Sequence, residues 1–298
     1  MIYTYTLNPS IDHYIFLNSE ISQNATNRAY KEYFICGGKG INVSLALKAL
    51  GIDSVCSGIC GGFTGDELLR QLKDAGINTE FVLTKENTRI NTKAVYNGEV
   101  TEINSKGADI SEETLEKLLY GISTLSKKDT AIISGSLPYD ETVICRIFDT
   151  VKKSDAEMIT DTSGKALLLS LKYKPDFIKP NISELSQLFD TNIGFEEVPF
   201  YAGKLVISGI KHVIVSCGGC GAYYADENGC RYLQVNETGL KVRNTTGAGD
   251  SMIAGYLYVR ERKLDPFVCA VSAGSASAYC ERTLDKDTFD LVYNSYQS

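Results

Sequence analysis

The feature that most constrains the fold of this 298-residue chain is a regular alternation of short apolar strands and amphipathic helices. After a strand over 53–59, for example, Leu68, Leu69 and Leu72 recur at helical spacing and Gly76 ends the helix. Further strands are predicted at 2–7, 79–83, 130–134, 158–161, 177–179 and 212–216. Strands separated by helices predict an α/β fold built on a mostly parallel sheet with right-handed crossovers.

Two segments break this alternation because they contain strands without helices. Residues 11–35 are predicted to form two strands before any helix begins, with aromatic and β-branched residues mixed among polar ones. Residues 88–104 read as a hairpin that turns at Asn97-Gly98, which is a strong hairpin signal. We expect these two segments to form one small sheet that stands off the main sheet.

A glycine-rich stretch at 244–255 leads into a predicted helix and suits an anion-binding site. Gly247 and Gly249 flank Ala248, so bare N–H groups at the start of the helix can approach a phosphoryl group. Asp250 beside this anion hole could take the proton of a hydroxyl that attacks phosphorus. The alternative is that the glycines only shape a turn and Asp250 caps the helix. The stretch matches neither a Walker A sequence nor a dinucleotide fingerprint.

Other polar or glycine-rich loops also follow predicted strands. Ligands of open parallel sheets bind at the carboxyl ends of the strands, so these loops should meet at one edge. They comprise residues 8–12, 37–42, 134–136, 179–184 and 216–221, in addition to 245–250. Six such loops at one edge favour a ligand site over six unrelated turns.

Four side chains, two in the loop 37–42 and two in the hairpin 88–104, suit a polyhydroxy or phosphorylated ligand. Lys39 and Asn42 lie in a second glycine-rich loop that enters a helix, although that loop alone could be a simple strand-to-helix turn. Arg89 and Asn91 have the same parity on the first strand of the hairpin and therefore point to one face. Taken alone, Arg89 would be a solvated edge residue.

Three further features bear on a nucleotide and a metal ion. Asn181 and Glu184, three residues apart, either share a hydrated magnesium ion or form the N-cap and N3 positions of a helix. The glycines of 216–221 offer N–H donors to phosphates. Small residues at 270–278 either admit a flat adenine ring or mark tight helix packing.

Composition narrows the class of protein. The net charge of −7 and the pI near 5.1 argue against a nucleic-acid binder. The first residues lack a basic leader with an apolar run, and no stretch approaches the ~18 apolar residues of a membrane span. We therefore expect a cytoplasmic protein without nucleic-acid or membrane partners.

The nine cysteines are an odd number and are scattered along the chain, which predicts reduced thiols. Cys217 and Cys220 have the spacing of a redox or zinc half-site, but no second ligand pair lies near them. The chain has only two histidines, so we expect these cysteines to be packing residues in a glycine loop.

Together these motifs resemble the PfkB or ribokinase-like carbohydrate kinase family over essentially the whole chain. The segments that carry the resemblance, in the family's order, are Thr6-Leu7-Asn8-Pro9-Ser10-Ile11-Asp12, Gly37-Gly38-Lys39-Gly40-Ile41-Asn42, Ser134-Gly135-Ser136-Leu137-Pro138, Lys179-Pro180-Asn181-Ile182-Ser183-Glu184 and Thr246 to Ser251. The resemblance implies one ribokinase-like α/β domain over 1–298, with helices on both faces of the sheet. The small sheet, about 11–35 and 88–104, would be a lid, which in this family often builds a homodimer contact.

Within the family, Thr88-Arg89-Ile90-Asn91 is most similar to the branch that acts on phosphorylated ketohexoses. The implied reaction is transfer of phosphate from ATP, with Mg²⁺, to a small-molecule sugar phosphate. Fructose 1-phosphate, converted to fructose 1,6-bisphosphate, is the first expected substrate and tagatose 6-phosphate the alternative. A catalytically silent sugar-phosphate sensor is a more remote alternative. A third alternative, a nicotinamide-dependent oxidoreductase, lacks support because no G-x-G-x-x-G fingerprint follows the first strand.

The resemblance also implies roles for individual residues. It implies Asp250 as the catalytic base and Gly247, Ala248 and Gly249 as the anion hole. Of the residues implied to bind the acceptor, Asp12, Gly38 and Asn42 would hold sugar hydroxyls, and Lys39, Arg89, Asn91, Arg28 and Ser136 would hold the phosphate already on the sugar; Gly37 is implied to bind the acceptor as well. Those implied to face MgATP are Lys179, Asn181, Glu184, Ser216, Gly218, Gly221, Thr246 and Ser275, with Asn181 and Glu184 reaching the metal through water.

Two departures from the family pattern concern the shape of the pockets. After Pro138 the family usually continues with a glycine-containing loop, whereas Tyr139 and Asp140 here run directly into a helix. Cys217 and Cys220 occupy nucleotide-loop positions where an aliphatic and a polar or charged residue are expected.

Overall fold

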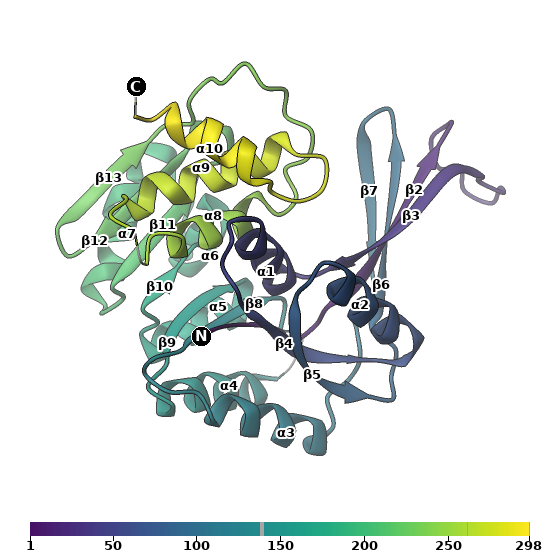
Figure 1. Ribbon diagram of the computed structural model, residues 1–298, viewed down its shortest axis with the longest axis horizontal. Helices are drawn as coiled ribbons and strands as arrows, with labels where there is room; N and C mark the ends of the chain where they lie inside the picture. Colours follow the sequence, from purple (N-terminus) through teal and green to yellow (C-terminus); the bar gives the residue numbers. More distant parts are fainter. Residues whose placement is uncertain (138–139, 261, 298) are drawn as a thin grey trace.

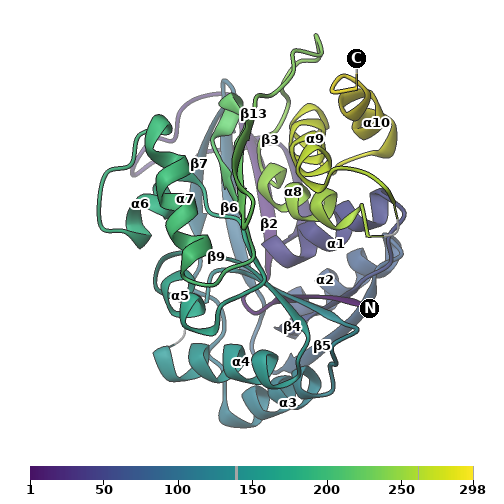
Figure 2. The ribbon, with the colours of Figure 1, turned by 90° about the vertical axis from the view of Figure 1, so that its left-hand side faces the viewer.

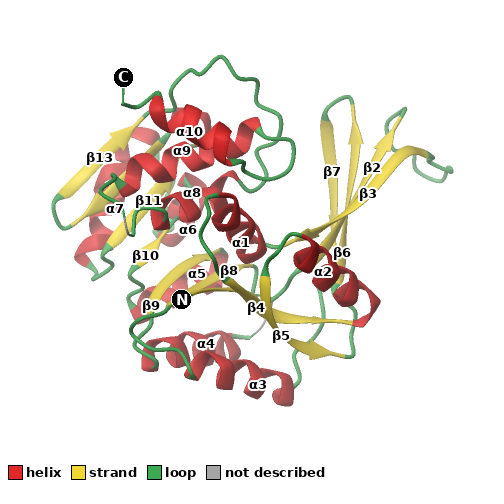
Figure 3. Cartoon of the chain, in the orientation of Figure 1, coloured by secondary structure: helices red, strands yellow, loops and turns green. Residues whose placement is uncertain are grey.

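A computed structural model describes residues 1–137, 140–260 and 262–297, whose strands form two sheets (Figure 1, Figure 3). The main sheet has the strand order β13-β12-β11-β10-β9-β8-β1-β4-β5. Its neighbours run parallel except where β12 pairs antiparallel with β11 and with β13. The predicted α/β fold with a mostly parallel sheet is confirmed.

The strands of the main sheet are short and mostly apolar. They are β1 (Ile2–Thr6), β4 (Val55–Gly61), β5 (Asn78–Thr84), β8 (Thr130–Gly135), β9 (Glu157–Thr162), β10 (Phe177–Ile178), β11 (His212–Ser216), β12 (Ala222–Asp226) and β13 (Gly229–Leu233). The helices are α1 (Lys39–Ala49), α2 (Gly62–Asp74), α3 (Glu112–Ser123), α4 (Glu141–Lys153), α5 (Gly164–Ser170), α6 (Ile182–Leu188), α7 (Val198–Ile207), α8 (Ala248–Leu257), α9 (Pro266–Tyr279) and α10 (Lys286–Asn294). Single 3-10 turns lie at Leu171–Tyr173, Phe195–Glu197 and Gly218–Cys220.

Two layers of helices bury the main sheet, as the two views at right angles show (Figure 1, Figure 2). Alternate residues of β8 point to opposite layers, as a pleated strand requires. Ile132 packs in the core that α1, α8, α9 and α10 cover. Ala131 and Ile133 pack in the core under α3, α4 and α5, and α6 and α7 continue that layer over β11. Helices on both faces are therefore confirmed.

The second sheet is the predicted small sheet, and it projects from the main body at the upper right of Figure 1. Its order is β3-β2-β6-β7, formed by β2 (Ser10–Leu17), β3 (Ala29–Gly37), β6 (Arg89–Tyr96) and β7 (Glu99–Asn104). Strands β2 and β6 pair in parallel, while β3 and β7 add antiparallel edges. The segments 11–35 and 88–104 thus come together although more than fifty residues separate them.

Strand order fixes where a ligand can bind. The chain begins at β1 in the middle of the main sheet, continues to β4 and β5 on one side, and later adds β8 to β11 on the other. The order therefore reverses at β1, and loops that leave neighbouring strands there diverge and open a crevice. Residues 7–9 after β1 pass directly into the small sheet, which stands over this crevice.

Several elements differ from the sequence prediction. Helix α8 begins at Ala248, whereas the helical pattern predicts residues from Ser251 onward. Helix α7, with Pro199 in its first turn, and the hairpin β12–β13 are absent from the prediction. Within the described residues, no helix is both long and apolar enough to cross a membrane.

Candidate active site

A cleft of about 610 Å³ opens at the carboxyl ends of the central strands, between the main sheet and the small sheet. This volume is typical of small-molecule sites. Many residues singled out from the sequence line it together: Asp12, Gly38, Lys39, Asn42, Arg89, Asn91, Ser136, Lys179, Asn181, Glu184, Ser216, Thr246, Gly247, Gly249 and Asp250.

A second pocket of about 360 Å³ adjoins the cleft and is more apolar. Predicted nucleotide contacts line it: Ser216, Gly218, Gly221 and Ser275, with Ala248 of the anion hole. Val242 and Met252 contribute apolar surface, as a flat base would need. The two pockets share Asn181, Ser216 and Gly249, so a donor in one would meet an acceptor in the other at the start of α8.

The start of α8 forms the boundary between the pockets. Gly247 adopts a left-handed conformation with φ 83°, which a residue without a side chain enters at little cost. The N–H groups of the first helical turn have no acceptor within the helix, and the first of them, at Ala248, donates to Thr245 O at 3.3 Å. A Cβ atom at Gly249 would lie 2.9 Å from Lys179 Nζ, so glycine at this position lets the lysine reach the helix start.

Asp250 lies in the first turn of α8 and is 6% exposed. Asn42 Nδ2 donates a hydrogen bond to Asp250 Oδ2 at 2.7 Å. Burial and the nearby Asp161 carboxylate raise the pKa of Asp250 to about 6, against the opposing effects of Asn42, Lys39 and Lys179. A carboxylate with a pKa near neutrality can accept a proton and release it again.

Asp161 at the end of β9 is a buried member of the site that the sequence analysis did not single out. Its Oδ1 lies 3.4 Å from both Lys39 Nζ and Lys179 Nζ. Burial opposes ionisation of Asp161, but the two lysines dominate and hold its pKa below the ordinary value. Its place at the carboxyl end of a predicted strand, at the same edge as the other loops, was the available signal.

Asn181 and Glu184 form the capping box of α6. Asn181 Oδ1 accepts from Glu184 N at 2.8 Å, and Glu184 Oε2 accepts from Asn181 N at 3.0 Å. The capping alternative is thus correct, although both residues also line the cleft. Glu184 Oε1 faces Lys39 Nζ at 3.9 Å.

A magnesium ion held mainly through water fits this side of the cleft. Asp161 Oδ2 is buried without a hydrogen-bond partner among the described residues, and Glu184 brings a second carboxylate. Carboxylate oxygens and retained waters are what magnesium prefers. No group of three or more His, Cys, Asp or Glu side chains that could hold a metal ion occurs in the described ranges.

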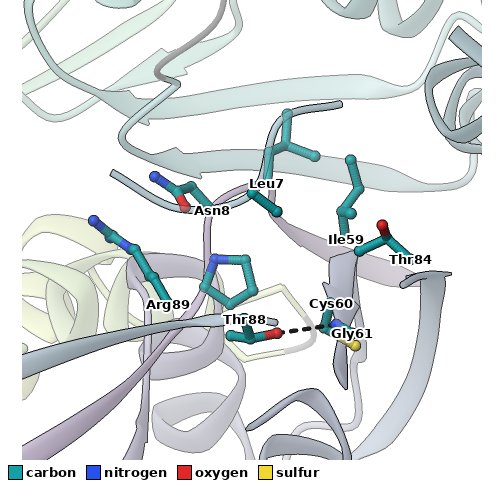
Figure 4. A pocket seen from close by; sticks show the side chains of 10 residues that line it. Leu7, Asn8, Ile59, Cys60, Gly61, Thr84, Thr88 and Arg89 are labelled. Atoms are coloured by element: carbon teal, nitrogen blue, oxygen red, sulfur yellow. Dashed lines mark hydrogen bonds between the residues drawn. The ribbon is translucent and has the colours of Figure 1, made fainter. Parts of the chain in front are cut away.

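The small sheet forms the opposite wall. Asp12 accepts hydrogen bonds from Ser10 Oγ at 2.7 Å and Asn91 Nδ2 at 3.1 Å. Arg89 lies beside the loop after β1, and Figure 4 shows its guanidinium and the Asn8 amide on the same side of a small adjoining pocket. In that pocket Gly61 N donates to Thr88 Oγ1 at 3.0 Å, which anchors the start of β6.

Three predicted residues lie elsewhere than expected. Thr246 lines the cleft, whereas its neighbour Thr245 lines the second pocket. Gly37 lines a third cavity behind the cleft, and Arg28 is exposed before β3 and does not line the cleft. The connection through Pro138 and Tyr139 lies outside the described residues. All nine cysteines, each within the described ranges, are free.

The fold and the site together define a kinase of the ribokinase-like class. Phosphofructokinase-2 from Escherichia coli, solved in complex with fructose 6-phosphate, superposes with a TM-score of 0.92 at 29% identity, covering 100% of this chain and 99% of that one. The 1-phosphofructokinase of Borreliella burgdorferi is 39% identical over 93% of this chain and 92% of its own. The tagatose-6-phosphate kinase of Staphylococcus epidermidis is 34% identical over 100% and 99%.

The profile of the pfkB family carbohydrate kinases matches residues 6–287, and the chain belongs to this family. It is therefore a sugar-phosphate kinase that transfers phosphate to an alcohol group, and family membership implies the use of ATP.

Proposed function

We propose that this kinase phosphorylates fructose 1-phosphate to fructose 1,6-bisphosphate with MgATP. The observation that carries the proposal is the position of Asp250, a buried carboxylate at the boundary of two adjoining pockets. Relatives named 1-phosphofructokinase, 39% and 37% identical to this chain, support fructose 1-phosphate as the acceptor.

Asp250 would act as the general base on the C6 hydroxyl. Asn42 donates to Oδ2, so we assign Oδ1 as the oxygen that receives the proton. As the proton moves to Asp250, the hydroxyl oxygen forms a bond to the γ-phosphorus and the bond to the ADP oxygen breaks. The N–H groups of the α8 start and the Lys179 ammonium stabilise the charge on the transferred group. Magnesium would neutralise the ATP phosphates when bound near Asp161 and Glu184.

The phosphate already on the sugar would bind at the far end of the cleft. Arg89 lies there with Ser136, and Lys39 extends from the start of α1 toward the transfer site. Asn91 suits this role less than expected, because its amide donates to Asp12. We assign Asn91 to the sugar, retain Arg89 and Ser136 for the phosphate, and assign Lys39, whose Nζ faces Asp161 and Glu184, to the transfer site.

The small sheet would serve as a lid that covers the acceptor and would join two copies of the chain. It bounds the cleft through Asp12, Arg89 and Asn91. It also projects from the body with large apolar side chains exposed, among them Phe34 and Ile103. A tetrameric form is named for the phosphofructokinase-2 of Escherichia coli, which supports assembly as a family property.

Phosphoryl transfer from MgATP to fructose 1-phosphate, tagatose 6-phosphate and fructose 6-phosphate at equal concentrations tests the proposal. We expect the largest kcat/KM with fructose 1-phosphate. A preference for tagatose 6-phosphate, the substrate class of a relative 34% identical, would keep the mechanism and change the acceptor. Binding without transfer to any of the three would favour a sugar-phosphate sensor.

The same assay with Asp250→Asn tests the base. Asn keeps the shape and can still accept from Asn42, but it cannot take a proton, so we expect kcat to fall by about 10²–10⁴-fold with little change in sugar-phosphate binding. The matched control is Asp74→Asn, an exposed aspartate on α2. Near-normal turnover by Asp250→Asn would contradict the assignment.

A further inference from the structure

Lys93 is a nearly buried lysine in the wall of the cleft that the phosphoryl-transfer mechanism does not use. It lies on β6 and is 6% exposed. Lysine is rarely buried unless it is paired, because its charge is costly to remove from water. Lys93 Nζ lies 3.1 Å from Asp12 Oδ2 and 3.7 Å from Glu102 Oε1, and donates to the Tyr14 hydroxyl at 3.3 Å.

Strand pairing explains why these groups meet. In the small sheet Asp12 pairs with Asn91 and Tyr14 with Lys93 across β2 and β6, and Lys93 pairs with Glu102 across β6 and β7. Residues paired in this way lie on the same face of the sheet. Asp12, Asn91, Lys93 and Glu102 all line the cleft, so this face points to the acceptor. One ammonium therefore ties three strands together at the wall of the acceptor site.

The hydrogen-bond capacity of Asp12 shows what Lys93 does there. An ionised carboxylate has about four acceptor positions and no donor. Ser10 and Asn91 both donate to Oδ1, and Lys93 pairs with Oδ2. Only one acceptor position, on Oδ2, is left for a ligand. Because the neighbours of Asp12 are fixed in the sheet, that position has one direction.

We propose that Lys93 is a positioning residue for the acceptor sugar: it orients Asp12 so that this carboxylate accepts a single hydroxyl from one direction and thereby selects the configuration of the ketohexose phosphate. This inference rests on the proposed function and deepens it. A hydroxyl donates into the open position of Oδ2, whereas an ionised phosphate has no proton to donate and is repelled by Asp12 and Glu102. The phosphate of the acceptor therefore lies away from Lys93, toward Arg89.

The consequence for specificity follows from geometry. Inverting one carbon of the sugar moves its hydroxyl away from the single open position and leaves Asp12 without that donor. Fructose 1-phosphate and tagatose 1-phosphate differ in this way, at one hydroxyl-bearing carbon. Without the Lys93 ammonium, Oδ2 gains a second open position and a wider range of orientations. Removing Lys93 should therefore weaken sugar binding and reduce discrimination between the two epimers.

The test compares Lys93→Met, which keeps most of the unbranched apolar stem, with Lys93→Arg, which keeps the charge. For Lys93→Met we expect KM for fructose 1-phosphate to rise about 10- to 100-fold, with KM for ATP nearly unchanged. We also expect the ratio of kcat/KM between the two epimers to shrink toward one. Lys93→Arg should change the KM for fructose 1-phosphate and the ratio between the epimers less than Lys93→Met does. The matched control is Lys31→Met, which removes an exposed lysine from β3 of the same sheet.

Three outcomes would overturn the inference. Lys93→Met could have wild-type kinetics, its KM could rise equally for fructose 1-phosphate and for ATP, or its ratio of kcat/KM between the two epimers could equal that of the wild type. A merely structural effect would lower activity with both epimers alike. If the wild type transferred no phosphate, the proposed function would fail on its own. Calorimetry with the two sugar phosphates in the absence of ATP would then decide the inference. Weaker binding to Lys93→Met than to the wild type would support it. Equal affinity of the two proteins, or no binding to the wild type, would overturn it.

Discussion

At the scale of single residues, the site is governed by buried charge. Asp161 stays ionised because two lysines face it, whereas Asp250 has mainly an amide partner and a neighbouring carboxylate. The two aspartates therefore titrate in different pH ranges although both are buried. Such a separation of pKa values is how an active site keeps one carboxylate charged and lets another exchange protons.

The raised pKa of Asp250 has a consequence for stability. The folded pKa is about 6 and the ordinary value is 3.8, so between these pH values the folded state binds more protons than the unfolded state. The protonated Asp250 carboxyl thus favours the folded state at low pH, and this stabilisation is lost as pH rises through the folded pKa. Above pH 6 the ionised carboxylate destabilises the fold by on the order of 1 to 3 kcal/mol.

We therefore expect Asp250→Asn to be more stable than the wild type at pH 8, with a difference that shrinks toward pH 4. Urea unfolding of both proteins at several pH values measures this difference. Asp74→Asn, exposed on α2, is the control and should give no pH-dependent gain of similar size. A variant less stable than the wild type at pH 8 would contradict the buried-charge argument.

The sequence predicts Asp250 and Asn42 as residues of one site, and the structure brings them to 2.7 Å of each other. Each follows a strand and starts a helix, which a local pattern can reveal. Asp161 and Lys93 were not predicted, because their partners are set by the order and register of strands far apart in the chain. Local patterns do not encode that register.

At the scale of elements, α8 and α9 are held close together by small residues. A Cβ atom at Gly255 would lie 2.2 Å from Cys269 O and 2.7 Å from Ala273 Cβ. The small residues of α9 therefore serve helix packing over most of their length, while Gly274 and Ser275 also line the second pocket. The packing interpretation of the stretch 270–278 is thus confirmed, whereas the approach of an adenine ring stays a prediction.

Gly255→Ala should destabilise the protein by about 1 to 3 kcal/mol, because one methyl group forces α8 and α9 apart. Gly203 in α7 is the matched control, since nothing lies within 4 Å of the position of its Cβ atom. Gly203→Ala should instead stabilise by about 0.5 to 1 kcal/mol through helix propensity. Denaturant unfolding compares the two variants, and equal effects would refute the packing argument.

A local signal did not always lead to a prediction. Asn97-Gly98 identified the hairpin β6–β7, whereas the hairpin β12–β13, which turns at Glu227-Asn228, was missed although Asn228-Gly229 is the same dipeptide. Helix α7 is apolar on most sides and has a proline in its first turn, so it lacks the periodic polar face by which a surface helix is recognised.

At the scale of the whole molecule, the cleft is lined by residues of two sheets that pack little against each other. The main sheet supplies Asp250 and the lysines through its loops, and the small sheet supplies Asp12 and Lys93. The inner ends of β2 and β3 pack against α1 and α2, and the outer part of the small sheet projects from the body without a covering layer in the described part of the chain. Few three-strand or four-strand sheets are stable with both faces exposed, so a cover for the outer strands is expected.

A second copy of the chain would supply that cover. Phe34 stacks on His13 at 4.2 Å, and strand pairing puts Ile103 on the same face, opposite to the face that carries Asp12. Phe34 is 45% and Ile103 is 61% exposed. Apolar side chains grouped on a projecting sheet are typical of an interface.

We expect light scattering to give the mass of a dimer for the wild type at micromolar concentration and a shift toward monomer for Ile103→Lys. A lysine there would bury a charge at the contact without touching the cleft face of the small sheet. Leu291→Lys, which adds a charge at an exposed leucine of α10, should leave the mass unchanged. A monomeric wild type, or equal masses for Ile103→Lys and the wild type, would exclude this face as the contact. If the dimer also holds the lid in place, Ile103→Lys will raise KM for the sugar phosphate more than KM for ATP, because only the sugar is bound by both sheets.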